Sequence, residues 1–465
     1  MDTNETPAQG SHRSHSIAAF LSFLWPGLGQ FYLRNRRAAA IFALPAVLVL
    51  ALVIYELRQG PIVFVARFVD PSFSRIAAII AVLFGLWRLA AVAHAFVGND
   101  RARARSVLDR AVVVALAAVI VISHAGAGFL LAQTSDATSH VFATPGPSSL
   151  VDLTTPVPSV DASATPGLTS TPTPVPSIDR RVTILLTGFD AGPGRQETLY
   201  DSMMLVSYDP VANSVQMINV PRDSTSFPLY FGKHQVVPTS LRLNSVPTNI
   251  AKGGIAGSPD SPYMTLVNEV SYLVGIQIDY YAAMDLGGFV KLIDQVGGID
   301  VVNPTAINDP YYDWLDGRPY GVIIPAGPQH LDGIHALAYV RSRKSAGDND
   351  FGRSSRQQEV LVALLHKMAQ PSEILNIPSL LSTLGSTVTT NFPAGQVADY
   401  VAIGQNVPSD HFTGFVLSPS AGYSEYLPSG ALCLFNARVA ALSVKLFGTD
   451  SLWSGKPAPA NTCPA

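Results

Sequence analysis

The sequence predicts an α/β layered domain that follows a helical membrane domain. Apolar stretches long enough to cross a bilayer are confined to the first 133 residues. A segment rich in proline, serine and threonine comes next, and short β-rich apolar runs then alternate with amphipathic helices. Alternating strands and helices are typical of a largely buried sheet that is covered by helices.

The membrane domain is expected over residues 17–133, after a short tail of residues 1–16. A transmembrane helix needs about 20 mostly apolar residues. Three stretches meet this: Ala38–Tyr55, Ile76–Val97 and Ala111–Ala132. A fourth, Ile17–Leu33, is shorter and interrupted by PGLGQ, so the sequence leaves open whether it spans or forms a re-entrant hairpin.

Charge predicts the orientation of these spans. Residues 1–133 carry 12 Arg and no Lys against 6 acidic residues, a net of +6, and the rest carries 18 basic against 27 acidic residues, a net of −9. Because short cytoplasmic loops are enriched in Lys and Arg, RNRR at 34–37 and RARARSVLDR at 101–110 are expected inside. The chain beyond Ala132 is then expected outside the cytoplasm.

Residues 134–178 are predicted to be a linker, because repeats such as TSTPTPVPS favour extended backbone and bury no core. The soluble domain begins with a buried strand at Val182–Phe189, and strands at 203–208 and 215–220 follow. Later runs are read as helices at Tyr263–Ile276, Phe289–Val296 and Val360–Met368, with further strands at YYAAMDL and IDVVN and a helix at GIHALAYVR. The sequence leaves open whether Cys433 and Cys463 pair.

Familiar catalytic motifs are absent from the sequence. It contains no Walker A loop, no G-x-S-x-G turn, no His/Cys metal spacing and no G-x-G-x-x-G after a strand. His330 and His335 flank LDGI at a spacing that does not suggest metal ligation. These observations argue against a serine hydrolase and against zinc chemistry.

Arginines and aspartates remain as the candidate site. Guanidinium groups match phosphate oxygens in pairs and stay charged, so a cluster of arginines predicts an anion site. The cluster comprises Arg222, Arg242, Arg341, Arg343, Arg353 and Arg356. The alternative is that these arginines form ordinary surface ion pairs with Asp348, Asp350 and Glu359. Nucleic acid is disfavoured as the anion, since a half with a net charge of −9 lacks a basic face.

Asp190 and Asp201 are expected to hold a metal ion. Asp190 ends the first predicted strand and Asp201 precedes the second, so both belong at the edge where α/β folds bind ligands. Two carboxylates together with substrate phosphates are a usual way to hold Mg²⁺, and Mn²⁺ is an alternative.

The ordered run ILLTGFD, YDSMMLVSYDP, VQMINVPRD, LIDQVGGIDV, LDGIHALAYVRSRK and DFGRSSRQQEVL resembles the LytR–CpsA–Psr family. This resemblance implies a three-layer α/β/α sandwich in a bacterial membrane-anchored enzyme, with an apolar pocket for a polyprenyl chain. It places the catalytic domain at residues 179–411 and leaves 412–465 as a C-terminal extension. It also implies a Mg²⁺-dependent phosphotransferase that moves an anionic glycopolymer or related glycan from a polyprenyl-pyrophosphate carrier to peptidoglycan.

Carried over residue by residue, the resemblance implies metal binding by Asp190 and Asp201. It implies pyrophosphate contacts from Arg222, Arg242, Arg341, Arg343, Arg353, Arg356 and Gln357. The catalytic set is Arg222, Asp223, Arg341, Arg343, Asp350 and Arg353, where Asp223 or Asp350 is expected to help deprotonate the acceptor hydroxyl. The run GFDAGPG departs from the family, which leaves one phosphate contact missing or supplied by Arg195.

Two other functions stay open at this level. A hydrolase that passes the phosphoryl group to water would use the same residues. A non-catalytic sensor of lipid-linked glycan is also conceivable, although the retained pair Asp190 and Asp201 speaks against it. Transcriptional regulation is disfavoured, because the expected cytoplasmic parts are too small for a DNA-binding fold.

Overall fold

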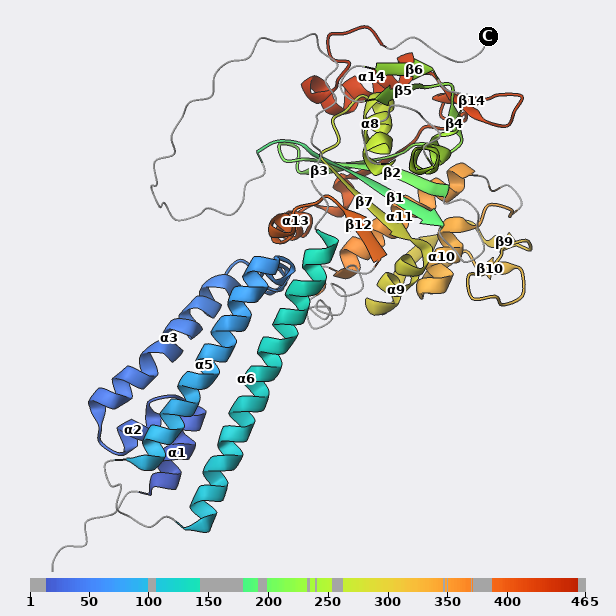
Figure 1. The fold of residues 1–465 in the computed structure, drawn as a ribbon. Coiled ribbons are helices and arrows are strands. Elements are labelled where there is room, and N and C mark those ends of the chain that lie inside the picture. Colours follow the sequence, from blue (N-terminus) through green and yellow to red (C-terminus); the bar gives the residue numbers. More distant parts are fainter. Residues whose placement is uncertain are drawn as a thin grey trace, which may run out of the picture. The chain divides into compact units, whose positions relative to one another are not determined.

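The computed structural model describes residues 14–98, 106–142, 179–190, 199–231, 235–238, 241–252, 262–345, 348, 350–368, 370 and 387–458. The chain divides into two compact units, Met1–Asp136 and Ala137–Ala465. Each unit has its own packed elements, which Figure 1 shows as a helical bundle and a sheet covered by helices.

Helices joined by short turns make up the described part of the N-terminal unit. Its helices are α1 (His15–Leu24), α2 (Leu28–Tyr32), α3 (Arg36–Leu57), α4 (Pro61–Ala66), η1 (Arg67–Val69), α5 (Pro71–Val97) and α6 (Val107–Val141). Within the described part of the chain, α3, α5 and α6 are long and apolar enough to cross a membrane. They contain the three predicted spans, and most of their surface is apolar and unburied, as lipid-facing helices require.

The interrupted fourth segment forms a short helical hairpin, α1–α2. Gly27 turns the chain with φ of +100°, and a Cβ on Gly29 would lie 1.9 Å from the Ala18 carbonyl oxygen, so the two helices need glycine to approach. Gln30 is buried, accepts from the Ser22 hydroxyl at 2.9 Å and donates to the Ala91 carbonyl at 2.8 Å. The 10-residue helix α1 is too short to span, which favours the hairpin over a fourth crossing.

Helix α6 ends later than the sequence predicted. The linker was expected from residue 134, but α6 continues to Val141. The physical reason is that the first proline of the linker is Pro145, and nothing before it removes a helical hydrogen bond. The rest of the predicted linker, 143–178, lies outside the described residues.

A six-stranded mixed sheet forms the centre of the second unit, in the order β12-β7-β1-β2-β3-β13. The strands are β1 (Val182–Asp190), β2 (Leu199–Asp209), β3 (Ser214–Asn219), β7 (Tyr280–Asp285), β12 (Val388–Thr390) and β13 (Phe412–Val416). β1 pairs with β7 and β3 with β13 in parallel, whereas the other pairs are antiparallel. The predicted strands at 182–189, 203–208 and 215–220 are confirmed as β1, β2 and β3.

Helices cover both faces of this sheet, so the predicted three-layer sandwich is confirmed (Figure 1). One face packs against α8 (Pro262–Val274), α14 (Asn436–Phe447), α7 (Val246–Ala251) and the turn η2 (Leu243–Ser245). The other face packs against α9 (Leu286–Gln295), α10 (Gly333–Arg341), α11 (Asp350–Met368) and α13 (Val397–Gly404). The alternating burial of β1 and β2 side chains supplies both cores.

Small two- and three-stranded sheets lie outside the central sheet. They are built from β4 (Ser224–Thr225), β5 (Pro228–Phe231), β6 (Gln235–Pro238), β8 (Ile299–Asn303), β9 (Ile307–Asp309), β10 (Val322–Ile324), β11 (Gly327–Leu331), β14 (Ser424–Tyr426) and β15 (Leu432–Leu434). β9 pairs with β10 and β8 with β11, and these hairpins pack against α10 and α11.

Residues 412–458 are part of the sandwich. They supply the edge strand β13, the covering helix α14 and strand β15, which pairs in parallel with β4. The backbone N–H of Leu432 donates to the Asp223 carbonyl at 2.9 Å, so β15 lies directly beside the PRD loop at 221–223. Cys433 in β15 is disulfide-bonded, and the chain's other cysteine, Cys463, lies outside the described residues.

Candidate functional site

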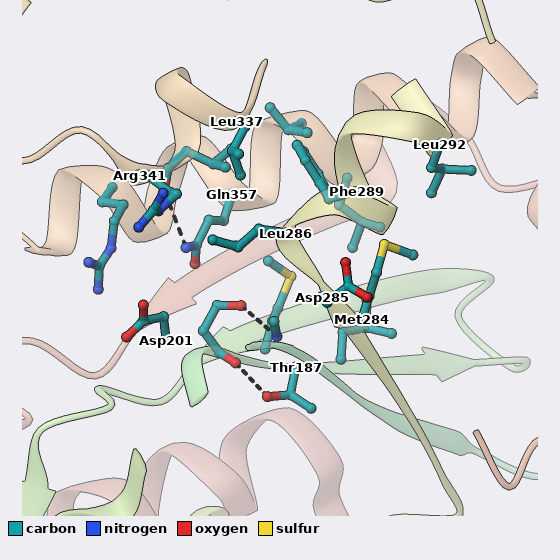
Figure 2. Close-up of a pocket in the computed structure, with 18 of the residues that line it drawn as sticks. Thr187, Asp201, Met284, Asp285, Leu286, Phe289, Leu292, Leu337, Arg341 and Gln357 are labelled. Atoms are coloured by element: carbon teal, nitrogen blue, oxygen red, sulfur yellow. Dashed lines mark hydrogen bonds between the residues drawn. The ribbon is translucent and has the colours of Figure 1, made fainter. Parts of the chain in front are cut away.

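A cavity of about 300 Å³ lies between the sheet and the helices α9, α10 and α11. Strands β1, β2 and β7 form its floor, and the three helices form its walls. Figure 2 shows Asp201, Arg341 and Gln357 toward one end and the apolar Phe289 and Leu292 toward the other. One carboxylate, Asp285, also lies near the apolar end, where it caps α9 by accepting from the Gly288 N–H at 2.7 Å. The cavity therefore suits an amphiphile.

Of the helices predicted at Tyr263–Ile276, Phe289–Val296 and Val360–Met368, only the last two, α9 and α11, line the apolar part of the cavity. The first, α8, packs on the other face of the sheet and contributes no residue to the lining, so its expected part in an apolar tunnel is not met. α9 contributes Leu286, Phe289 and Leu292, and α11 contributes Val360, Leu361 and Leu364. The apolar lining is completed by Leu186, Met204, Ala282, Met284, Leu337, Val340 and Val388. An open apolar surface inside a folded domain is stabilised when an apolar chain replaces the water in it.

Four arginines from separate elements meet at the polar part of the cavity. Arg222 follows β3, Arg341 ends α10, Arg343 lies in the turn after α10, and Arg353 lies in the first turns of α11. Asp201 and Gln357 lie among them. The sheet and helices thus bring together four of the six predicted arginines at one place.

Asp201 reaches the cavity because β2 contains a β-bulge. Gly188 of β1 pairs with Ser202 and Phe189 pairs with Tyr200, so Asp201 is the extra residue between them. Bulges redirect a side chain at the edge of a sheet, often beside a functional site. Arg222 Nη1 donates to Asp201 Oδ1, and Arg222 Nε lies 3.4 Å from Asp223 Oδ2.

Asp190, at the end of β1, is 4% exposed and faces a second arginine. Arg341 Nη2 lies 3.4 Å from Asp190 Oδ2. Each predicted metal-binding aspartate is therefore paired with an arginine of the cluster: Asp201 with Arg222 and Asp190 with Arg341. A buried carboxylate of this kind needs such a partner.

A buried amide network fixes the wall that Arg353 and Gln357 share. Asn219 Nδ2 donates to Gln357 Oε1 at 3.2 Å, and Gln358 Nε2 donates to Asn219 Oδ1 at 2.6 Å and to the Phe415 carbonyl at 2.9 Å. Arg353 itself is only 7% exposed. Because Asn219, Gln357 and Gln358 are joined by these hydrogen bonds, the position of α11 on the sheet is fixed, and with it the positions of its arginine and glutamine at the cavity.

The turn that carries Arg343 is held by Asp309, a residue that the sequence did not single out. Asp309 is 2% exposed, and its Oδ2 accepts from the Ser342 hydroxyl at 2.9 Å and from the backbone N–H groups of Arg343 and Lys344 at 3.2 and 3.1 Å. Its Oδ1 accepts from the Tyr311 N–H at 3.0 Å. Burial acts to raise the pKa of Asp309, but these hydrogen bonds outweigh burial and lower the pKa.

Tyr312 is a second residue that the sequence analysis missed. Its ring is 6% exposed and meets Trp314 edge to face at 5.0 Å. Burial raises the pKa of Tyr312 to about 12, while the neighbouring Arg341 acts to lower it. A neutral hydroxyl therefore lies beside Arg341. Neither Asp309 nor Tyr312 belongs to a sequence motif, since both are recognised only by their contacts with α10 and its following turn.

Four predicted site residues lie elsewhere or remain undescribed. Arg242 lines neither this cavity nor its mouth and instead donates to Asp223 Oδ1 at 2.8 Å. Arg356 donates to the Tyr339 carbonyl at 2.7 Å, to the Ser342 carbonyl and to Asp348 at 2.9 Å. For Arg356 the alternative of ordinary protein contacts fits better than the anion site. Asp350 begins α11, but its side chain and all of Arg195 lie outside the described residues.

The donor set permits a metal ion only together with substrate oxygens. Within the described residues no group of three or more His, Cys, Asp or Glu side chains is arranged to hold a metal. Asp190 and Asp201 are two carboxylates on adjacent strands, and Mg²⁺ typically takes one or two carboxylates, several waters and substrate phosphates. The residues therefore fit Mg²⁺ bound with a phosphorylated substrate.

Comparison with known proteins agrees with this architecture. Residues 161–418, more than half of the chain, match the LytR_cpsA_psr family. A Bacillus anthracis protein named polyisoprenyl-teichoic acid–peptidoglycan teichoic acid transferase TagU is 28% identical over 218 residues, which is 47% of this chain and 63% of that protein. A TagU from Halalkalibacterium halodurans is 26% identical over 236 residues, covering 50% and 69%. The chain thus matches less than two thirds of the Bacillus relative.

Two solved structures are also similar to this chain. Bacillus subtilis TagV is 25% identical, with a TM-score of 0.45 over 59% of this chain and 98% of that one. A structure of TagT bound to LIIa-WTA is 22% identical, with a TM-score of 0.43 over 60% and 94%.

Proposed function

The chain belongs to the LytR_cpsA_psr family, and on this basis we propose that it transfers a glycan from a polyprenyl-pyrophosphate carrier to peptidoglycan, forming a phosphodiester bond. The observation that carries the proposal is the cavity itself. It joins an apolar chamber to a cluster of four arginines and one aspartate. A polyprenyl chain with a pyrophosphate head is complementary to this cavity. The apolar chain matches the apolar chamber, and the anionic head matches the arginines.

The arginine cluster supplies the electrostatics that phosphoryl transfer needs. Arg222, Arg341, Arg343 and Arg353 would contact the pyrophosphate oxygens and neutralise the charge that builds up during transfer. Phosphoryl transfer needs mainly positioning and charge stabilisation from the protein. Asp190 and Asp201 would hold Mg²⁺, with Mn²⁺ as an alternative, and a bound metal would supply further neutralisation of the phosphate oxygens.

In the proposed transfer, one bond to phosphorus forms and one breaks. The oxygen of an acceptor hydroxyl forms a bond to the phosphorus next to the glycan, and the bond from that phosphorus to the bridging oxygen breaks. Polyprenyl phosphate leaves with the electron pair of the broken bond, and the hydroxyl proton goes to a nearby carboxylate. The arginines that bind the bridging and terminal oxygens stabilise the leaving phosphate.

We also propose that the chain is a multi-pass membrane protein with its α/β unit outside the cytoplasm. The helices α3, α5 and α6 support this by length and composition, and the arginines at 34–37 and 101–110 support the orientation. Such a placement would put the cavity in the compartment that contains peptidoglycan.

Transfer to purified peptidoglycan fragments tests the proposal. The full-length protein in proteoliposomes would receive a radiolabelled polyprenyl-pyrophosphoryl oligosaccharide and Mg²⁺, and labelled peptidoglycan and released polyprenyl phosphate would be measured. Arg222→Ala should abolish transfer. Arg318→Ala is the matched control, because Arg318 pairs with Asp316 on the surface of the same unit and should transfer normally.

The two alternatives give different products in the same assay. A hydrolase releases polyprenyl phosphate at the same rate with or without peptidoglycan, and the peptidoglycan never becomes labelled. A sensor binds the donor and releases nothing. Either pattern from the wild-type protein would replace the transferase proposal.

A further inference from the structure

We infer that a second, smaller cavity beside the arginine cluster is the subsite for the acceptor hydroxyl, with Asp223 as the group that receives its proton. This inference rests on the transferase function proposed above. It assigns the proton-accepting role to Asp223 and gives Arg242 a role that the main cavity does not explain.

The second cavity has a volume of about 20 Å³ and lies under the PRD loop. It shares Asp201, Ser202, Arg222, Arg353 and Gln357 with the main cavity. Its own lining includes Asp223, Ser354, Phe351 and Leu432. A space of this size admits one water-sized group, such as a hydroxyl, and does not admit a phosphate or a sugar ring.

The position of this cavity fits the geometry of the reaction. In phosphoryl transfer the attacking and leaving oxygens lie roughly in line on opposite sides of the phosphorus. The apolar part of the main cavity would hold the leaving polyprenyl phosphate. Arg222 and Arg353 line both cavities, so a hydroxyl in the second cavity would lie beside a phosphorus that these arginines hold, at a place that the polyprenyl chain does not occupy.

Among the side chains that the structure describes, Asp223 is the carboxylate that lines this cavity without lining the main one. Its two oxygens are held from two sides, by Arg222 Nε at 3.4 Å and by Arg242 Nη1 at 2.8 Å. Arg242 is thus a positioning residue that orients Asp223. As the oxygen–phosphorus bond forms, the acceptor proton passes to Asp223 and then to the solvent, while the bond to the bridging oxygen breaks.

A variant that fills the second cavity tests acceptor binding separately from donor binding. Ser354 lines only this cavity, so Ser354→Leu would occupy it without entering the lipid chamber. The matched control is Ser355→Leu on the same helix, because Ser355 is exposed. Thermal unfolding of both variants would confirm that the protein still folds.

We expect Ser354→Leu to bind the polyprenyl-pyrophosphate donor as the wild type does but to transfer about 100-fold more slowly, since loss of a positioned acceptor removes most of the orientation effect. Ser355→Leu should transfer normally. If Ser354→Leu transfers at the wild-type rate, or if it loses donor binding in parallel, the subsite assignment is wrong. If the wild type itself labels no peptidoglycan, the transferase function fails instead.

The role of Asp223 has its own readout. Asp223→Asn should transfer about 100-fold more slowly to an ordinary hydroxyl, a loss within the range for removal of a general base. With an acceptor whose hydroxyl is made more acidic by a neighbouring fluorine, the loss should shrink at least tenfold, because the proton leaves more easily. An equal loss with both acceptors would show that Asp223 does not take the proton.

Discussion

Replacing Asp309 with asparagine tests whether this buried carboxylate builds the arginine cluster. Asp309 lies on β9, more than 30 residues before the turn that it holds, and it touches no substrate in the proposed reaction. Asparagine keeps the size of the side chain but turns one acceptor oxygen into an NH₂ group. The substitution therefore changes hydrogen bonding and charge with little change in packing.

The magnitude follows from four hydrogen bonds. One carboxylate oxygen accepts three donors and the other accepts one, so the NH₂ group of asparagine must face at least one donor. A buried donor without an acceptor costs about 1–3 kcal/mol. Each of the three remaining hydrogen bonds weakens by about 1 kcal/mol, because its acceptor oxygen no longer carries a negative charge. These contributions add up to about 4–6 kcal/mol, so Asp309→Asn should lower the free energy of unfolding of the α/β unit by at least about 4 kcal/mol.

Urea unfolding of the full-length protein in detergent, followed by near-UV circular dichroism, measures this loss. The pKa of Asp309 is lowered in the folded state, so its contribution is full above the unfolded pKa of about 3.9 and is lost as pH falls through the folded pKa. The gap between wild type and variant should thus be constant above about pH 5 and narrow below about pH 4.

The donor KM gives a second measurement, because a loosened turn misplaces Arg343. We expect a raised KM for Asp309→Asn. The control is Asp316→Asn, which removes an exposed carboxylate from the same segment and should change neither quantity. A stability loss below about 0.5 kcal/mol with an unchanged donor KM would refute the idea that Asp309 organises the turn.

Three other changes probe the main cavity. Arg353→Lys should lower kcat/KM for the donor by about 100-fold without changing the melting temperature, because lysine lacks the planar fork that pairs phosphate oxygens. Leu364→Trp should fill part of the apolar chamber, so a long-chain donor loses at least about tenfold in kcat/KM, roughly 1.4 kcal/mol, while a short-chain donor reacts normally. Chelation with EDTA should stop transfer until Mg²⁺ is restored, and Asp190→Asn should require a higher Mg²⁺ concentration in the same titration. Transfer that persists in EDTA would exclude the metal role, and equal losses for both chain lengths would mean that Leu364 does not contact the lipid.

The sequence predicted the parts of the site that local pattern determines. The apolar runs and helical periodicities predicted β1, β2, β3, α8, α9, α10 and α11. The four arginines of the cavity lie at or next to the ends of β3, α10 and α11: Arg222, Arg341, Arg343 and Arg353. Residues at the ends of neighbouring elements meet because the fold brings those ends to one edge. The resemblance to the family added which of these residues belong together.

Long-range contacts account for what the sequence did not predict. Arg242 and Arg356 fit the same motifs as the other arginines, but their partners Asp223, Tyr339 and Asp348 draw them away from the cavity. Asp309 ends β9 and Tyr312 follows the turn after it, in a stretch whose sequence pattern is that of an ordinary turn, and their role appears only when β9 packs beside α10. The strand at Phe412–Val416 was expected to lie outside the catalytic domain, yet its pairing with β3 makes it an edge of the central sheet.

The pairing of β13 with β3 and of β15 with β4 has a consequence for how the protein folds. The PRD loop lies between β3 and β4, and both strands pair with segments made about 200 residues later. Contacts this distant in sequence close large loops and form slowly. During synthesis, β1, β2 and β3 can associate as soon as they emerge, but the wall of the acceptor cavity that Leu432 provides must wait. The reaction centre is therefore completed late, after most of the sandwich has been made.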